Sequence, residues 1–124
     1  MDTRRKILTL AAAEGLRRPL VLVTGTFDIL RAGHVRELAD VRERTPGATL
    51  LAVVLPSPAA ALDQRARAEM AAALRMVDYV VSADYGDVER LILKLEPAEV
   101  VRLESSHARL YAQLTEHVRR SQDR

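Results

Sequence analysis

Residues 20–34 have the sequence LVLVTGTFDILRAGH, and this stretch predicts how the fold begins. The apolar, partly β-branched run over residues 20–23 is typical of a strand that is buried on both faces. A turn that contains Gly25 follows, and the spacing of apolar residues then predicts a helix over residues 33–44. A strand, a glycine-bearing turn and a helix in this order indicate the first half of a β-α-β unit.

The same alternation continues along the chain. Further strands are predicted over residues 49–55 and 79–81, and a fourth strand is predicted to begin at Val100. Helices are predicted over residues 4–16, after a cap at Asp63, around residues 88–95 and over residues 106–120. The apolar stripe of the helix that Asp63 caps is expected to consist of Ala66, Met70, Ala73, Leu74 and Val77.

Strands that alternate with helices predict an α/β fold: a three-layer, Rossmann-like parallel sheet with helices on both faces. A length of 124 residues predicts a single domain over residues 1–124. In sheets of this kind ligands bind beyond the carboxyl ends of the strands. Chemistry is therefore expected in the loops that follow residues 23, 55, 81 and 103.

Composition excludes several classes of protein. The chain has 19 basic and 17 acidic residues, and a formal charge of +2 is too small and too scattered to predict a nucleic-acid partner. The absence of cysteine excludes a disulfide scaffold and a zinc–thiolate site. No apolar run approaches the roughly 20 residues that a membrane span needs. We therefore expect a cytoplasmic protein with no membrane partner, and we expect no protein-bound metal.

The turn after the first strand suits phosphate. Gly25 would let a phosphate approach the backbone closely. Gly33 lies where a helix begins, and a helix start aims free N–H groups and a positive dipole end at an anion. His34 would then lie in the first helical turn, near that anion. The alternative is a plain strand–helix turn with His34 in solvent.

These residues also resemble a more specific pattern. Residues 25–30 (GTFDIL), followed two positions later by Gly33 and His34, resemble the signature of the cytidylyltransferase-like nucleotidyltransferases. Residues 67–70 (RAEM) and 73–81 (ALRMVDYVV) are similar to a second stretch of that family. The likeness covers roughly residues 4–104 and includes the nucleotidylyltransferase domains of bifunctional heptose biosynthesis proteins.

The resemblance implies an activity. Members of the family transfer a nucleotidyl group from a nucleoside triphosphate, here ATP or CTP, to a small phosphorylated acceptor, a sugar phosphate or an alcohol phosphate. Pyrophosphate leaves, and Mg²⁺ arrives with the triphosphate. The resemblance implies catalytic roles for His34 and Arg31, and a homodimer is a possible assembly. It also implies a set of residues that bind the nucleotide and its phosphates: Thr24, Gly25, Thr26, Phe27, Asp28, Gly33 and Arg102.

The chain departs from the family pattern at several positions. Arg31 stands where the family has the first histidine of its motif, and the loop over residues 56–61 (PSPAAA) has no basic residue. Residues 102–104 (RLE) lack two glycines that the family has there. Residues 104–109 are either a compressed form of a final phosphate loop or the start of a helix that precedes it. These departures favour an alternative: a catalytically impaired relative that binds a nucleotide or a partner protein.

Overall fold

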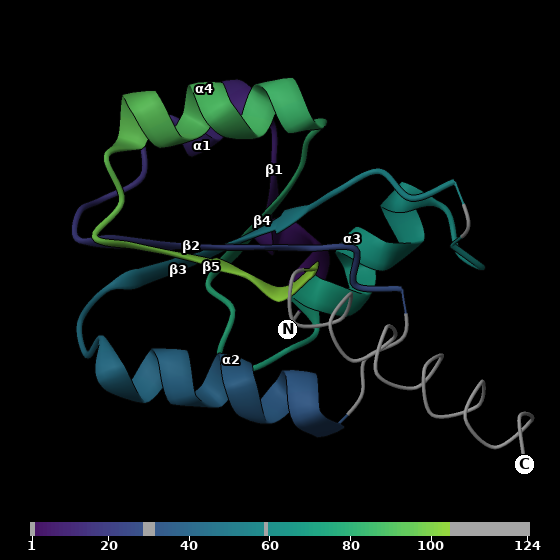
Figure 1. The fold of residues 1–124 in the computed structure, drawn as a ribbon, viewed down its shortest axis with the longest axis horizontal. Coiled ribbons are helices and arrows are strands. Elements are labelled where there is room, and N and C mark those ends of the chain that lie inside the picture. Colours follow the sequence, from purple (N-terminus) through teal and green to yellow (C-terminus); the bar gives the residue numbers. More distant parts are fainter. Residues whose placement is uncertain (1, 29–31, 59, 105–124) are drawn as a thin grey trace, which may run out of the picture.

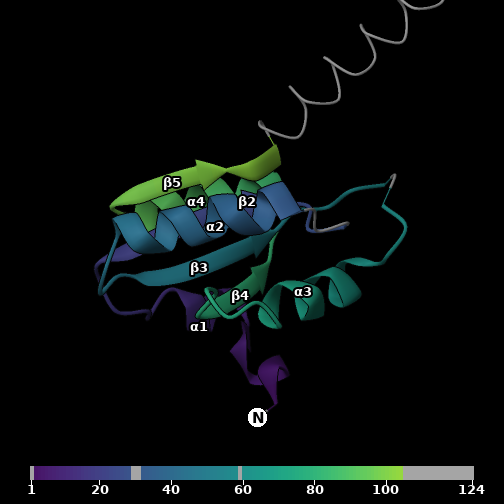
Figure 2. The same ribbon diagram turned by 90° about the horizontal axis from the view of Figure 1, so that it is seen from below.

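A parallel sheet of five strands forms the centre of the molecule. The computed structural model describes residues 2–28, 32–58 and 60–104. Across the sheet the strand order is β1-β4-β3-β2-β5, and every neighbouring pair is parallel. Figure 2 shows β5, β2, β3 and β4 side by side in that order. The strands are β1 (Ile7–Leu8), β2 (Leu20–Gly25), β3 (Thr49–Val54), β4 (Tyr79–Ser82) and β5 (Glu99–Arg102).

Helices cover both faces of this sheet, so the predicted three-layer α/β fold is confirmed. Helices α1 (Leu10–Ala13) and α4 (Tyr85–Leu95) lie on one face, and α2 (Ala32–Arg44) and α3 (Gln64–Ala72) lie on the other (Figure 1). A short 3-10 helix, η1 (Thr3–Lys6), precedes β1. Among the described residues, no helix combines the length and the apolar character that crossing a membrane requires.

The central strands divide the core into two apolar clusters. On β2, Val21 and Val23 pack with the α2 and α3 face, whereas Leu20 and Leu22 pack with the α1 and α4 face. All six residues of β2 are buried. Side chains alternate between the faces of a strand, so a strand covered on both sides is apolar throughout. This is why the short run over residues 20–23 predicted β2 correctly.

The predicted helix over residues 4–16 is wrong. Ile7 and Leu8 instead form β1 and pair with Val80 and Val81 of β4. The helix that follows begins only after Thr9, whose side chain accepts a hydrogen bond from the backbone of Ala12 at 3.1 Å. The apolar residues of this segment have a helical spacing by chance, and pairing with a strand distant in the sequence makes part of the segment a strand instead.

Helix α3 begins where the sequence predicts it, but it buries a different face. The Asp63 side chain caps it by accepting from the Ala66 N–H at 2.7 Å. The buried residues are Arg67, Ala68, Ala71 and Ala72, whereas Ala73 of the expected stripe is exposed. Alanines occur on several sides of this helix, so apolar spacing says little about its orientation. The predicted helix over residues 106–120 lies outside the described residues.

Candidate functional site

The turn that carries most of the predicted site residues lies at the carboxyl edge of the sheet. Strand β2 ends at Gly25, and the chain passes through Thr26, Phe27 and Asp28 before α2 begins at Ala32. The neighbouring strands β3 and β5 end at the same edge, because all strands are parallel. Ligands of parallel α/β sheets bind at this edge.

Phe27 gives the turn its shape. Its backbone has φ of 54°, in the left-handed region that residues other than glycine seldom adopt. The side chain is 5% exposed and belongs to the core cluster on the α2 and α3 face. Burial of the ring therefore holds the backbone in a conformation that a solvent-exposed phenylalanine would avoid.

Arg67 of α3 holds the turn in place through hydrogen bonds, and this role was not predicted from the sequence. Its side chain is 2% exposed. Nη1 donates to the carbonyl oxygens of Thr26 at 2.8 Å and Leu55 at 2.7 Å, and Nε donates to that of Leu62 at 3.1 Å. The guanidinium thus joins the turn after β2 to the loop after β3. The only sequence signal was that Arg67 opens the second stretch resembling the family.

Asp28 makes a second link between these two loops. Its carboxylate accepts hydrogen bonds from the backbone N–H groups of Ala61 at 3.0 Å and Leu62 at 3.1 Å. Because both carboxylate oxygens are used on backbone donors, Asp28 acts as a support of the turn. The loop around residues 56–62 has no basic side chain of its own, yet it is anchored to the turn that follows β2.

Gly25 is a glycine for a packing reason that the sequence does not show. A Cβ at this position would lie 3.3 Å from Cβ of Leu103 and 3.3 Å from Cε2 of Phe27. Leu103 is 4% exposed and packs in the same core cluster as Phe27. The space in front of Gly25, which a phosphate was expected to approach, is therefore partly filled by Leu103.

The side chain of Thr24 is also hydrogen-bonded within the protein. Its hydroxyl donates to the Glu104 carboxylate, with both carboxylate oxygens 2.9 Å away, and Thr24 has no exposed surface. Arg102 lies on the same face of β5 as Val100, which packs against the α1 and α4 cluster. It pairs with Glu89 of α4 at 3.6 Å. Arg102 and Thr24 thus lie toward α4, away from the face that α2 and Arg67 cover.

The remaining predicted residues lie at the start of α2. Gly33 and His34 are in its first turn, and His34 is partly buried. Arg31 falls outside the described residues. The structure therefore brings Gly25–Asp28 and the start of α2 together at one edge. Arg102 ends β5 at the same edge, where it pairs with Thr24, but its side chain lies toward α4. Within residues 2–28, 32–58 and 60–104, no group of three His, Asp or Glu side chains is arranged to hold a metal ion.

A three-layer parallel sheet with a glycine-bearing turn between β2 and α2 is the architecture of the Rossmann-like class of α/β domains. The chain belongs to the cytidylyltransferase-like family, whose model matches residues 22–122. The match contains the turn, α2, α3 and the described carboxyl ends of strands β2 to β5.

Individual relatives agree with this assignment. The chain is 37% identical over 100 residues to the bifunctional protein HldE of Rhodopseudomonas palustris, covering 73% of this chain and 19% of that protein. It is 34% identical over 110 residues to the D-beta-D-heptose 1-phosphate adenylyltransferase of Bordetella bronchiseptica, covering 81% and 67%. It is 39% identical over 85 residues to the FAD synthase of Methanothrix thermoacetophila, covering 62% and 57%.

A solved structure shares the fold. The lipopolysaccharide core biosynthesis protein of Thermoplasma volcanium superposes with a TM-score of 0.58 at 25% identity, over 65% of this chain and 70% of the other. The chain spans about a fifth of the HldE protein and just over half of the FAD synthase.

Proposed function

We propose that the protein transfers a nucleotidyl group from ATP or CTP to a sugar phosphate or an alcohol phosphate and releases pyrophosphate. The observation that carries the proposal is the turn over residues 25–28, held at the carboxyl edge by Arg67 and Asp28 and followed by the start of α2. Relatives named as an adenylyltransferase and as FAD synthases support a nucleotidyl transfer reaction. Those relatives leave the base and the acceptor open.

The chemistry requires positioning and charge stabilisation rather than a covalent enzyme intermediate. A phosphate oxygen of the acceptor would attack the α-phosphorus, the new P–O bond would form, and the bond to the pyrophosphate oxygen would break. Backbone N–H groups of the turn and of the first turn of α2 would bind the phosphates. His34 would donate to the α- or β-phosphate as charge develops there. Magnesium would come as the complex of the triphosphate, which supplies its ligands.

Two measurements test this function. Calorimetry with MgATP and MgCTP should detect binding of one of them, and a pyrophosphate-release assay with heptose 1-phosphate or glycerol 3-phosphate should detect turnover. Replacing His34 by Ala should lower the rate by roughly 10²–10³, as the loss of one preorganised donor does. Arg36→Gln, an exposed change two residues along α2, is the matched control and should leave the rate unchanged. Absence of binding of both nucleotides at millimolar concentration would overturn the proposal.

Two contacts favour a second candidate, a catalytically impaired relative that binds a nucleotide or a partner protein. Leu103 fills space in front of Gly25, and the Glu104 carboxylate lies on Thr24, where its negative charge repels phosphate. Replacing Leu103 by Gly should open this space, and Arg31→His should restore the histidine that the family has. Turnover that appears only in these variants identifies an impaired enzyme. Turnover in the unaltered protein that falls on Arg31→His shows that Arg31 has taken over the role.

Assembly is a separate proposal. Resemblance to the family suggests a homodimer, and light scattering of the purified chain measures its mass directly. A monomer across the concentration range of the activity assay contradicts the homodimer.

A further inference from the structure

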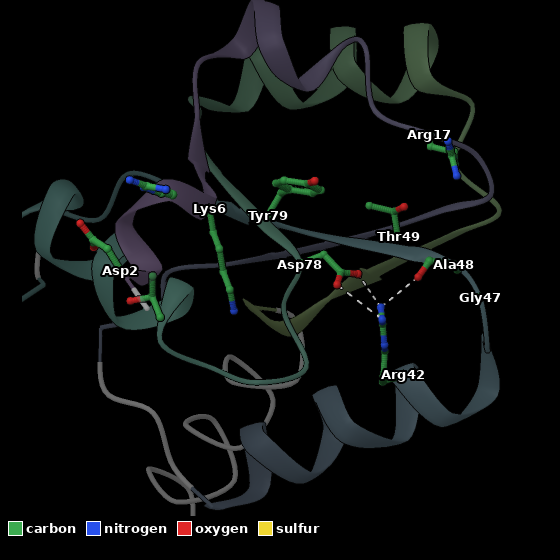
Figure 3. Close-up of a pocket in the computed structure, with 11 residues that line it drawn as sticks. Asp2, Lys6, Arg17, Arg42, Gly47, Ala48, Thr49, Asp78 and Tyr79 are labelled. Carbon is green, nitrogen blue, oxygen red and sulfur yellow. Dashed lines mark hydrogen bonds and ion pairs between the residues drawn. The ribbon is translucent and has the colours of Figure 1, made fainter.

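A groove of about 860 Å³ lies at the opposite edge of the sheet from the turn described above (Figure 3). It is lined by residues at the starts of β3 and β4, by η1 and by the segment after α2. Strand β3 runs from Thr49 at the groove to Val54 near the carboxyl edge. At about 3.3 Å per residue, a strand of this length separates the two edges by more than the span of a phosphate group.

Two of the charges in the groove are already neutralised by one another. Arg42 donates to the Asp78 carboxylate, with Nη1 2.6 Å from Oδ2 and Nη2 3.4 Å from Oδ1, and Nη1 also donates to the Ala48 carbonyl at 2.9 Å. Asp78 in turn accepts from the Leu50 N–H at 2.8 Å. Figure 3 shows Arg42 pointing from α2 toward Asp78. This pair is part of the wall and carries little net charge.

Positive charge remains once these pairs are removed. The Lys6 ammonium donates hydrogen bonds to the carbonyl oxygens of Leu74 at 3.2 Å and Val77 at 2.9 Å, and neither oxygen carries a formal charge. The other lining carboxylate, Asp2, pairs with Arg4 at 3.1 Å. Arg5 and Arg17 are exposed, and no ion pair joins either of them to another residue of the described part of the chain. Three cationic side chains of the groove therefore have no anionic partner within residues 2–28, 32–58 and 60–104.

The groove also offers an aromatic surface and hydroxyl groups. Tyr79, the first residue of β4, is 37% exposed although it belongs to a strand. In the close-up its ring lies between the side chains of Lys6 and Thr49 (Figure 3). Thr3 and Thr49, which carry hydroxyl groups, belong to the same lining. An exposed ring beside cations and hydroxyls is a suitable surface for a ligand that is planar at one end and anionic at the other.

We propose that this groove binds a small phosphorylated molecule that carries a planar ring. The unpaired positive charges of Arg5, Arg17 and Lys6 on the lining attract the phosphate, because guanidinium and ammonium groups without carboxylate partners are effective phosphate donors. Tyr79 packs against the ring. A volume of about 860 Å³ is within the range of small-molecule sites. The site is separate from the proposed transfer reaction and does not depend on it.

The test is an NMR titration of the full chain with phenyl phosphate at low salt, because that probe has both features. Amide shifts are expected at Gly47–Thr49 and Asp78–Tyr79 and not at residues 25–28. The double variant Arg5→Gln/Arg17→Gln should bind at least about tenfold more weakly, since charge-assisted hydrogen bonds are lost. The matched control Arg36→Gln/Arg65→Gln removes the same charge from exposed positions outside the groove and should bind as the unaltered protein does.

A second variant separates the ring from the phosphate. Tyr79→Ala should weaken the binding of phenyl phosphate and leave the binding of inorganic phosphate, which is weaker, unchanged. Far-UV circular dichroism checks that the variant is folded. Three results would each overturn the proposal: shifts confined to residues 25–34, equal weakening in the two double variants, or no groove shifts at tens of millimolar phenyl phosphate. None of these results depends on whether the protein binds ATP or CTP.

Discussion

At the scale of single residues, the buried guanidinium of Arg67 is the contact that organises the carboxyl edge. It satisfies carbonyl oxygens from the turn after β2, the end of β3 and the loop before α3. Replacing Arg67 by Met should lower the free energy of unfolding by about 2–3 kcal/mol, because buried carbonyls lose a charged donor. Urea unfolding followed by circular dichroism measures the change. The free energy of unfolding of Arg67→Lys should lie between those of the unaltered protein and Arg67→Met, since an ammonium group keeps the charge but cannot reproduce the planar guanidinium.

The matched control lies two residues away on the same helix. Arg65 is exposed and pairs with Glu69 at 3.4 Å. Arg65→Met should change stability by about 0.5 kcal/mol or less, as exposed ion pairs contribute little. If the Arg65 and Arg67 variants lose the same stability, the buried hydrogen bonds are not what Arg67 supplies.

Gly25 allows a direct test of the packing between β2 and β5. A Cβ at this position would be 3.3 Å from both Leu103 and Phe27, so Gly25→Ala should destabilise the fold by about 1–3 kcal/mol through overpacking. Leu103→Gly removes one of the two crowded neighbours. A double-mutant cycle should therefore show that the two changes together cost less than their sum. Additive losses would mean that Leu103 does not limit the space at Gly25.

At the scale of elements, α4 begins with a reciprocal cap formed by two aspartates. Asp84 accepts from the Asp87 N–H at 2.7 Å, and Asp87 accepts from the Asp84 N–H at 3.3 Å. The Arg90 side chain, and then the Asp84 backbone, hold the pKa of Asp87 below its usual value. A carboxyl whose pKa is lower in the folded state stabilises the fold above about pH 4 and loses that contribution as pH falls further.

The urea midpoint of the unaltered protein should therefore fall more steeply between about pH 4 and pH 2 than that of Asp87→Asn. Asp40→Asn, an exposed change on α2, is the control and should keep the steep fall. Parallel curves for the unaltered protein and Asp87→Asn would show that the cap does not contribute through its charge.

The sequence predicted the strands that are buried on both faces well. It failed where pairing with a strand distant in the chain determines the secondary structure. Strands β2, β3 and β4 follow from short apolar runs that lie inside the sheet, and the apolar pair at residues 100–101 marks β5 at its edge. The helix predicted over residues 4–16 failed because Ile7 and Leu8 pair with β4, more than 70 residues away. Residue spacing contains no information on such a partner. In α3 the burial of Arg67 was not predicted, since a pattern of apolar residues cannot identify a charged residue that packs inward.

The candidate site shows the same limit. Its glycines, Asp28 and the helix start follow from local sequence and a family resemblance. The contacts that shape it come from residues 67, 103 and 104, which are distant in the chain. The resemblance implies that Arg102 binds phosphates, and this stays a prediction. In the structure Arg102 pairs with Thr24 in the sheet, and its side chain lies toward α4 because side chains alternate along β5.

At the scale of the whole molecule, both helical layers pack on the same two strands. Leu22 and Leu51 contribute to the α1 and α4 cluster, while their neighbours Val21 and Leu50 contribute to the α2 and α3 cluster. A defect in one layer should therefore weaken both together. Leu51→Ala, at a fully buried position, should lower the free energy of unfolding by about 2–5 kcal/mol. The transition should remain a single one, with the same denaturant dependence.

Hydrogen exchange resolved by residue can separate the layers. In Leu51→Ala, the most protected amides of α2 should lose as much protection as those of α4, because both helices rest on β2 and β3. Leu93→Ala is the control, since Leu93 on α4 is 79% exposed and its loss should change stability by about 0.5 kcal/mol or less. Selective loss of protection in α4 would instead divide the molecule into two cooperative units. The turn over residues 25–28 would then belong to the unit formed with α2 and α3, because Phe27 packs in that cluster.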